Sequence, residues 1–396
     1  MLFTDKLRTL EGGIPYGMGP FDYLDQSARP EAAKVRALLE EMLANYPGAH
    51  APELAKRLRT NDETTHNAAF FELCLHEVLV RRGYVIEDVE EPAPGSSKRP
   101  DYLLREPDGS SFYVEATVAS GLSDKELAAE RRLGAVLDAL RLLQHPRFMV
   151  AVQGPKGPAS PVSINKLRKQ VIEWLDSLDP EVPPPQEEDK PEDDEQEDEA
   201  DAPQEKGSWS RTFAIGDYRL TLKAVPRRPG ADIMVGIASI AYSLRAISPV
   251  DAIRKKLFDK ARRYGNELGR PFFIAVSSTQ LLQRDEDFEE ATFGRLAYSW
   301  VGDSPDAIAT RQQDGLWLQG SGPRYSRVSG VLCFSKLAPW SLASAKARVL
   351  LNPFAERPMS LDALGLPMAR VVDDELRTAD GLTVASILGL TPGWPE

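Results

Sequence analysis

The sequence predicts an α/β protein with a helical N-terminal region, a mixed core and a large α+β insertion, and three observations lead to this. At 396 residues and 42% hydrophobic composition, the chain can bury a substantial core. Segments with apolar residues at helical spacing alternate with short segments patterned like strands. An acidic, proline-rich stretch over residues 180–207 interrupts that alternation.

The chain up to Gly83 is predicted to be mainly helical. Apolar residues recur at helical spacing behind Pro30, and Gly83 has the position of a C-terminal cap. Helices are expected over residues 31–46, 52–59 and 66–82. Strand patterns follow at residues 84–89, 101–105 and 112–118. The Asp108-Gly109 pair between the last two strands indicates a hairpin.

Further elements are expected on both sides of the acidic stretch. Before it come a helix over 122–144, a strand over 148–153 and a helix over 165–178. After it come a hairpin around Gly216-Asp217, a basic helix over 249–268, a buried strand over 271–278, a strand over 328–334, an extended piece over 348–351 and a weakly patterned tail. The predicted regions are 1–60 (helical), 61–118 with 247–280 (core), 119–246 (insertion containing a disordered loop over 180–207) and 281–396 (mixed structure).

Composition limits the class of protein. Cys74 and Cys333 lie far apart inside apolar runs, so neither a disulfide framework nor a cysteine zinc site is expected. No segment has the length of an apolar membrane span, and the charged N-terminus does not fit a secretory signal. We therefore expect a cytoplasmic protein with no membrane partner.

The negative charge of the chain is concentrated in one segment. Residues 181–206 hold 13 acidic and 2 basic residues, a net charge of −11 out of −12 for the whole chain. This segment has little apolar surface to bury and is predicted to be a disordered linker. The remainder has a net charge of −1, so charge does not exclude a nucleic-acid partner.

Three carboxylates are spaced to meet in one place. Asp101 begins one strand of the predicted hairpin and Glu115 lies within the next, so antiparallel pairing would bring them together. Glu72 lies on the helix before them. Such a cluster would repel itself unless a cation neutralised it, and Mg²⁺ or Mn²⁺ prefers hard oxygen ligands of this kind. The sequence therefore predicts that Glu72, Asp101 and Glu115 bind a divalent metal.

The segment over residues 71–117 resembles the PD-(D/E)xK nuclease superfamily. Pro100-Asp101 matches the first half of its motif and Glu115 the second, while the position of Glu72 is similar to that in archaeal Holliday-junction resolvases. The resemblance implies a restriction-endonuclease-like αβββαβ core, and metal binding by the three acids with help from the Ala116 carbonyl. It further implies Mg²⁺- or Mn²⁺-dependent hydrolysis of nucleic acid, with DNA the favoured substrate, in restriction or anti-phage defence.

One residue departs from that family pattern. Thr117 stands where the family has a catalytic lysine, and a hydroxyl cannot supply the positive charge. Lys260 is the expected replacement, with Lys256 behind it, and the segment from Lys260 to Tyr264 resembles the family's Gln-x-x-x-Tyr helix motif with lysine for glutamine. This assignment makes residues 119–246 an insertion.

An alternative completes the core differently. The helix over 122–144 and the strand over 148–153 could follow the hairpin directly, which would place Arg131 or Arg132 near the metal. The later helix is preferred because residues 249–270 hold seven basic and three acidic side chains. The residues expected to contact nucleic acid are Arg254, Lys255, Lys256, Arg262, Arg263 and Tyr264.

Two competing interpretations of the whole chain stay open. One is a catalytically inactive module that kept the fold, lost the lysine and serves as a nucleic-acid-binding or protein-interaction scaffold. The other is an unrelated α/β protein in which the carboxylates never converge. Beside the cluster, His76 is expected to be satisfied within the local packing and Glu77 to face solvent.

Overall fold

The computed structural model describes most of the chain, in segments separated by short gaps. The described residues are 1–89, 98–122, 124–182, 209–228, 236–241, 248–264, 268–279, 283–300, 307–320, 322–373 and 375–396. Nearly all of the loop predicted over 180–207 lies outside them. The chain divides into two compact units, which we describe separately. The first unit comprises Met1–Gly12, Gly19–Gly121 and Ile247–Glu396, and the second comprises Gly13–Met18 and Leu122–Ala246.

The first unit begins with four helices. They are α1 (Pro20–Gln26), α2 (Pro30–Asn45), α3 (Ala51–Leu58) and α4 (Glu63–Arg81). The longest, α4, starts earlier than the spacing of its apolar residues predicts because the Asp62 carboxylate caps it, accepting the Thr65 backbone N–H at 2.8 Å. After α4, Gly83 adopts a positive φ of 83°, the conformation that ends a helix and favours glycine.

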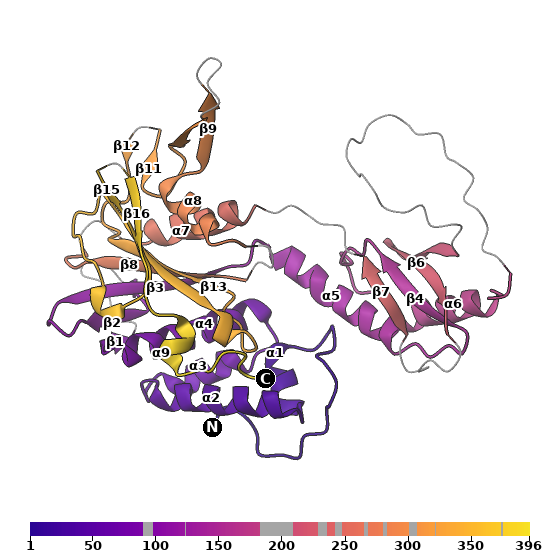
Figure 1. Ribbon diagram of the computed structural model, residues 1–396. Helices are drawn as coiled ribbons and strands as arrows, with labels where there is room; N and C mark the ends of the chain where they lie inside the picture. The colour runs from indigo at the N-terminus through magenta and orange to yellow at the C-terminus, as the bar shows by residue number, and fades with distance from the viewer. Residues whose placement is uncertain are drawn as a thin grey trace. The chain divides into compact units, whose positions relative to one another are not determined.

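An eight-stranded mixed sheet forms the centre of the first unit (Figure 1). Its strands, in spatial order, are β1 (Val85–Val89), β2 (Tyr102–Arg105), β3 (Ser111–Ala119), β8 (Phe272–Ser278), β13 (Gly330–Ser335), β14 (Lys346–Leu351), β15 (Met368–Val372) and β16 (Glu375–Ala379). The strands β1, β2 and β3 are antiparallel neighbours, and β3 pairs with β8 in parallel. Helix α7 (Pro249–Ala261) precedes β8 in the chain.

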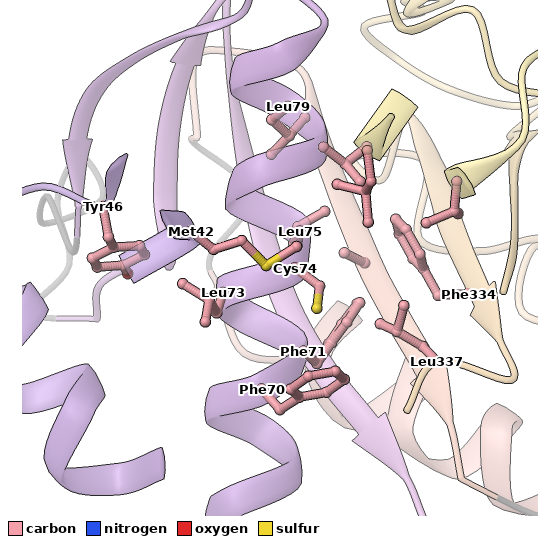
Figure 2. Close-up of a cluster of buried hydrophobic side chains, with 14 of the residues drawn as sticks. Met42, Tyr46, Phe70, Phe71, Leu73, Cys74, Leu75, Leu79, Phe334 and Leu337 are labelled. Carbon is pink, nitrogen blue, oxygen red and sulfur yellow. The ribbon is translucent and has the colours of Figure 1, made fainter. Parts of the chain in front are cut away.

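Each face of this sheet is covered by helices, and side chains of β3 alternate between the two faces. Phe112 and Val114 join the core under α4, whereas Tyr113 joins the core under α7 and α8 (Glu286–Phe293). Figure 2 shows the α4 side, where Phe70 and Phe71 lie next to Phe334 and Leu337 from the far half of the sheet. Strand β3 therefore lies between two helical layers.

The remaining elements of the first unit are short. They are β9 (Leu296–Trp300), β10 (Ala307–Arg311), β11 (Leu318–Gln319), β12 (Gly322–Pro323), α9 (Val384–Leu388) and two 3₁₀ turns at Leu342–Ser344 and Asp362–Leu364. The C-terminal region, predicted as a part of mixed structure, thus supplies β13 to β16 of the central sheet. Within the residues that the structure describes, no helix has the length and apolar character needed to cross a membrane.

The second unit has a sheet of its own. It contains α5 (Asp124–Arg141), β4 (Phe148–Gln153), α6 (Ile164–Asp176), β5 (Ser210–Ile215), β6 (Tyr218–Pro226) and β7 (Ile237–Ala241). The strand order is β5-β6-β4-β7, and both helices contribute to its core. Strand β4 therefore pairs with β6 and β7, while the place beside β3 is taken by β8. The helix that carries Arg131 and Arg132 also belongs to this unit.

Candidate acidic site on the central sheet

Asp101 immediately precedes β2, and Glu115 lies in the neighbouring strand β3. The register pairs Tyr102 with Val114 and Leu103 with Tyr113, which places Asp101, one step further, opposite Glu115. The Asp101 carboxylate accepts the Ala116 backbone N–H at 2.6 Å. Glu115 is completely buried and follows the alternation of β3 onto the face covered by α7. The hairpin thus brings both carboxylates to one place on the sheet.

The end of α7 supplies three partners to Glu115. The Lys260 ammonium and the Tyr264 hydroxyl both donate to its carboxylate, and the Arg263 guanidinium donates at 2.7 Å. The Tyr264 hydroxyl oxygen also lies 2.9 Å from the Arg99 backbone carbonyl oxygen, two residues before Asp101. The structure therefore brings Lys260, the expected substitute for the family lysine, into direct contact with Glu115.

Burial and like charge alter the acidity of this cluster. Burial, and next the Glu115 charge, raise the pKa of Asp101 from its ordinary 3.8 to about 7, against the lowering effects of Lys260 and the Ala116 N–H. Burial and the Glu115 charge also raise the pKa of Tyr264, so its hydroxyl stays a hydrogen-bond donor. At neutral pH, Asp101 is therefore poised between its protonated and ionised forms.

Glu72 belongs to the same electrostatic cluster but has different partners. Arg57 of α3 binds both of its carboxylate oxygens, at 2.7 and 3.0 Å, and the Tyr46 hydroxyl donates to one of them at 2.6 Å. The Tyr102 hydroxyl donates to the Glu72 backbone carbonyl at 3.0 Å, which holds α4 beside the start of β2. The Glu72 charge contributes to the raised pKa of Asp101, so the two carboxylates influence one another.

Sequence patterns do not predict that Arg57 and Tyr46 contact Glu72. The prediction of a metal rested on an acidic cluster without a partner, whereas in the structure Arg57 binds Glu72 and both Lys260 and Arg263 bind Glu115. Arg57 and Glu72 lie on different helices 15 residues apart, and neither periodicity nor a motif links them. The hydrophobic spacing predicts the helices α3 and α4, but it does not predict that the side chains of Arg57 and Glu72 contact each other.

Two neighbours of Glu72 on α4 are also buried. Glu77, expected to face solvent, is only 1% exposed because Arg81 and Asn45 donate to its carboxylate, so that expectation was wrong. His76 packs with its ring centre 4.6 Å from that of Tyr46. Its packing leaves Nδ1 without a hydrogen-bond partner among the described residues, and burial lowers the pKa of His76 to about 4.

The remaining predicted site residues have varied surroundings. Thr117 is half-buried on β3, two positions beyond Glu115 and opposite Val276 of β8. Arg254 forms an ion pair with Asp314 at 2.9 Å, so its charge is already engaged. Lys255 is exposed and Lys256 is half-buried on α7. Arg262 is exposed and donates to the Tyr325 hydroxyl at 2.8 Å.

Comparison of the chain with protein-family models, with curated proteins and with solved structures finds no match. In the part of the chain that the structure describes, no group of three or more histidine, cysteine, aspartate or glutamate side chains is arranged to hold a metal ion. The function must therefore be inferred from the chemistry of the cluster itself.

Proposed function

We propose that this protein is a metal-dependent nuclease that hydrolyses phosphodiester bonds of nucleic acid, with DNA the favoured substrate. The observation that carries the proposal is the contact between Lys260 and the buried Glu115, beside Asp101. A lysine reaching the acid pair from α7 restores the positive charge that Thr117 lacks. A role in restriction or anti-phage defence would suit such an enzyme.

The order of elements around this contact supports the same proposal. Helix α4, the antiparallel strands β1, β2 and β3, then α7 and the parallel strand β8 follow one another in the order expected of an αβββαβ core. Residues 122–246 then form an insertion between β3 and α7. In this arrangement Asp101, just before β2, and Glu115, in β3, would correspond to the two acids of the PD-(D/E)xK motif.

The donor set suits Mg²⁺ or Mn²⁺. Asp101 and Glu115 offer carboxylate oxygens and Ala116 offers a backbone carbonyl, all of them hard ligands. Glu72 would become the third acid only when released from Arg57. Bound there, a divalent cation would neutralise charge on the phosphate and make water acidic enough to attack. Because Lys260 and Arg263 now occupy one Glu115 oxygen, metal binding requires at least one of them to move.

The protein's own side chains have separate roles in this proposal. Lys260, released from Glu115, stabilises the charge that develops on the phosphate. Tyr264 donates to the second Glu115 oxygen and so fixes the orientation of the carboxylate. Arg263, 42% exposed, reaches the solvent side of the cluster and can contact the phosphate backbone. Asp101 must be ionised to bind metal, so its raised pKa favours activity above neutral pH.

Cleavage assays test the proposal. Wild type is incubated with single- and double-stranded DNA and RNA, with Mg²⁺, Mn²⁺ or a chelator, beside Asp101→Ala and Glu115→Ala. The control is Asp108→Ala, an exposed acid on the same hairpin. We expect metal-dependent cleavage by wild type and the control and none by the two site variants. Cleavage that survives in both site variants would place the active site elsewhere.

A second candidate is a catalytically inactive module with this fold that binds nucleic acid or a protein. One observation favours it: Glu72 and Glu115 already have cationic partners from the chain itself, so their charges are balanced without a metal. This candidate predicts binding of nucleic acid that does not depend on metal and is followed by no cleavage. The same assays, with a binding measurement added, separate the two candidates.

A further inference from the structure

Arg57 lies outside the core elements that the proposed function invokes. It stands in the last turn of α3, in the helical N-terminal region. Its guanidinium binds both oxygens of Glu72 in a two-pronged arrangement, at 2.7 and 3.0 Å. The same fork geometry matches a phosphate as well as a carboxylate, because both present two oxygens in one plane. Arg57 is therefore chemically equipped for a second partner.

The surroundings of Arg57 differ from those of a sealed structural ion pair. Its side chain is 32% exposed, whereas that of Glu72 is 14% exposed. The Glu72 backbone carbonyl accepts the Tyr102 hydroxyl at 3.0 Å, and Tyr102 adjoins Asp101, so the ion pair of Arg57 with Glu72 lies beside the candidate site. Lys260 and Arg263 reach the same cluster from α7. A phosphate bound at Asp101 and Glu115 would thus meet cations from two separate elements of the first unit.

We propose that Arg57 contacts the substrate phosphate, and that it does so by exchanging the Glu72 carboxylate for the phosphate when Glu72 turns to the cation. The inference rests on the proposed function and adds to it a substrate-binding residue from the N-terminal helices. In the absence of substrate, Arg57 and the Tyr46 hydroxyl donate to the Glu72 carboxylate, so this carboxylate has partners. When the cation and substrate are bound, each charge has a new partner, and no charge is left unpaired.

The exchange has two measurable consequences. Because Arg57 would bind the phosphate in the substrate complex, losing it should raise KM more than it lowers kcat. Because Arg57 competes with the cation for Glu72, losing it should also lower the Mg²⁺ concentration that gives half-maximal activity. A guanidinium that only joined α3 to α4 would change neither quantity.

The test uses steady-state cleavage of a duplex oligonucleotide by the full chain. The variants are Arg57→Ala and Arg57→Lys. The control is Lys56→Ala, which removes one exposed charge from the same helix turn; the Lys56 side chain is 80% exposed. For Arg57→Ala we expect KM to rise about 10- to 100-fold, the loss typical of a charged hydrogen bond. The dependence of log KM on log salt should weaken by about 0.9, the value of one duplex phosphate contact.

Arg57→Lys keeps the positive charge but loses the two parallel N–H donors of the guanidinium. We therefore expect the salt dependence of KM to equal that of wild type, and KM to rise less than in Arg57→Ala. An Arg57→Ala enzyme whose KM, salt dependence and Mg²⁺ requirement equal those of Lys56→Ala would overturn the inference while leaving the nuclease proposal intact. A wild type that cleaves no substrate at all would overturn the nuclease proposal and this inference with it. Arg57→Lys also covers the case in which Arg57→Ala fails to fold.

Discussion

The raised pKa of Asp101 predicts how the free energy of unfolding changes with pH. Its pKa in the folded state is raised to about 7, above the ordinary 3.8 that applies when the chain is unfolded. Between these values the folded protein binds the proton more tightly than the unfolded chain. The free energy of unfolding should therefore fall as pH rises from about 4 to 7 and should show no further loss from this group above that range.

Substituting Asp101→Asn isolates this effect. Asparagine keeps an oxygen that can accept the Ala116 N–H, but it cannot ionise. The difference between these two pKa values corresponds to about 4 kcal/mol at most. Asp101 is half-buried, so screening by solvent reduces the expected gain in unfolding free energy at high pH to about 1–3 kcal/mol. The gain should be smallest at the acid end of the tested range, where Asp101 of the folded wild type is still protonated.

The assay is urea unfolding without metal, from about pH 5 to pH 8, with the difference between variant and wild type plotted against pH. The control is Asp108→Asn in the same hairpin. Hydrogen bonds from Ser110 lower the pKa of Asp108, so its protonation changes only below the tested range. A stability difference for Asp101→Asn that does not grow with pH, or that shrinks, would refute the reasoning about Asp101.

Three further substitutions have expected outcomes. Tyr264→Phe removes the hydroxyl that donates to the buried Glu115, so thermal unfolding should show a loss of about 1–3 kcal/mol; an unchanged midpoint would contradict the role given to this hydrogen bond. Phe71→Ala leaves a cavity between α4 and the sheet, so urea unfolding should show a loss of about 3–5 kcal/mol in unfolding free energy. A loss below about 1 kcal/mol would indicate a loosely packed core. Gly134→Ala would place a methyl group 2.5 Å from the Tyr16 carbonyl, so faster proteolysis near Tyr16 is expected, and an unchanged cleavage pattern would count against that packing.

The meeting of Asp101 and Glu115 was predictable because a local signal fixes the register. The turn that contains Asp108-Gly109 joins β2 to β3, and Gly109 adopts a φ of 96° that suits glycine. Once the turn is fixed, the period of two along each strand determines which side chains share a face. Lys260 was found from the helix motif rather than from geometry.

The burial of Glu77 and the strands β15 and β16 could not be predicted from local sequence patterns. Glu77 was misjudged because a charged residue on a helix usually faces solvent, and its pairing with Arg81 and Asn45 became visible only in the folded protein. The strands β15 and β16 were missed because they are the last two strands at one end of the sheet, with β16 at its edge. Much of their surface is exposed, so they lack the apolar alternation that identifies a strand.

Binding of Mn²⁺, measured by isothermal titration calorimetry, tests the central claim that a divalent cation occupies the cluster of Asp101 and Glu115. We predict saturable binding by wild type and a loss in affinity of about tenfold or more in Glu115→Gln. The control Glu289→Gln, in an acid that pairs with Arg348 on the same face of the sheet, should bind like wild type. Binding that is absent from wild type, or unchanged in Glu115→Gln, would contradict the metal site and favour the non-catalytic module.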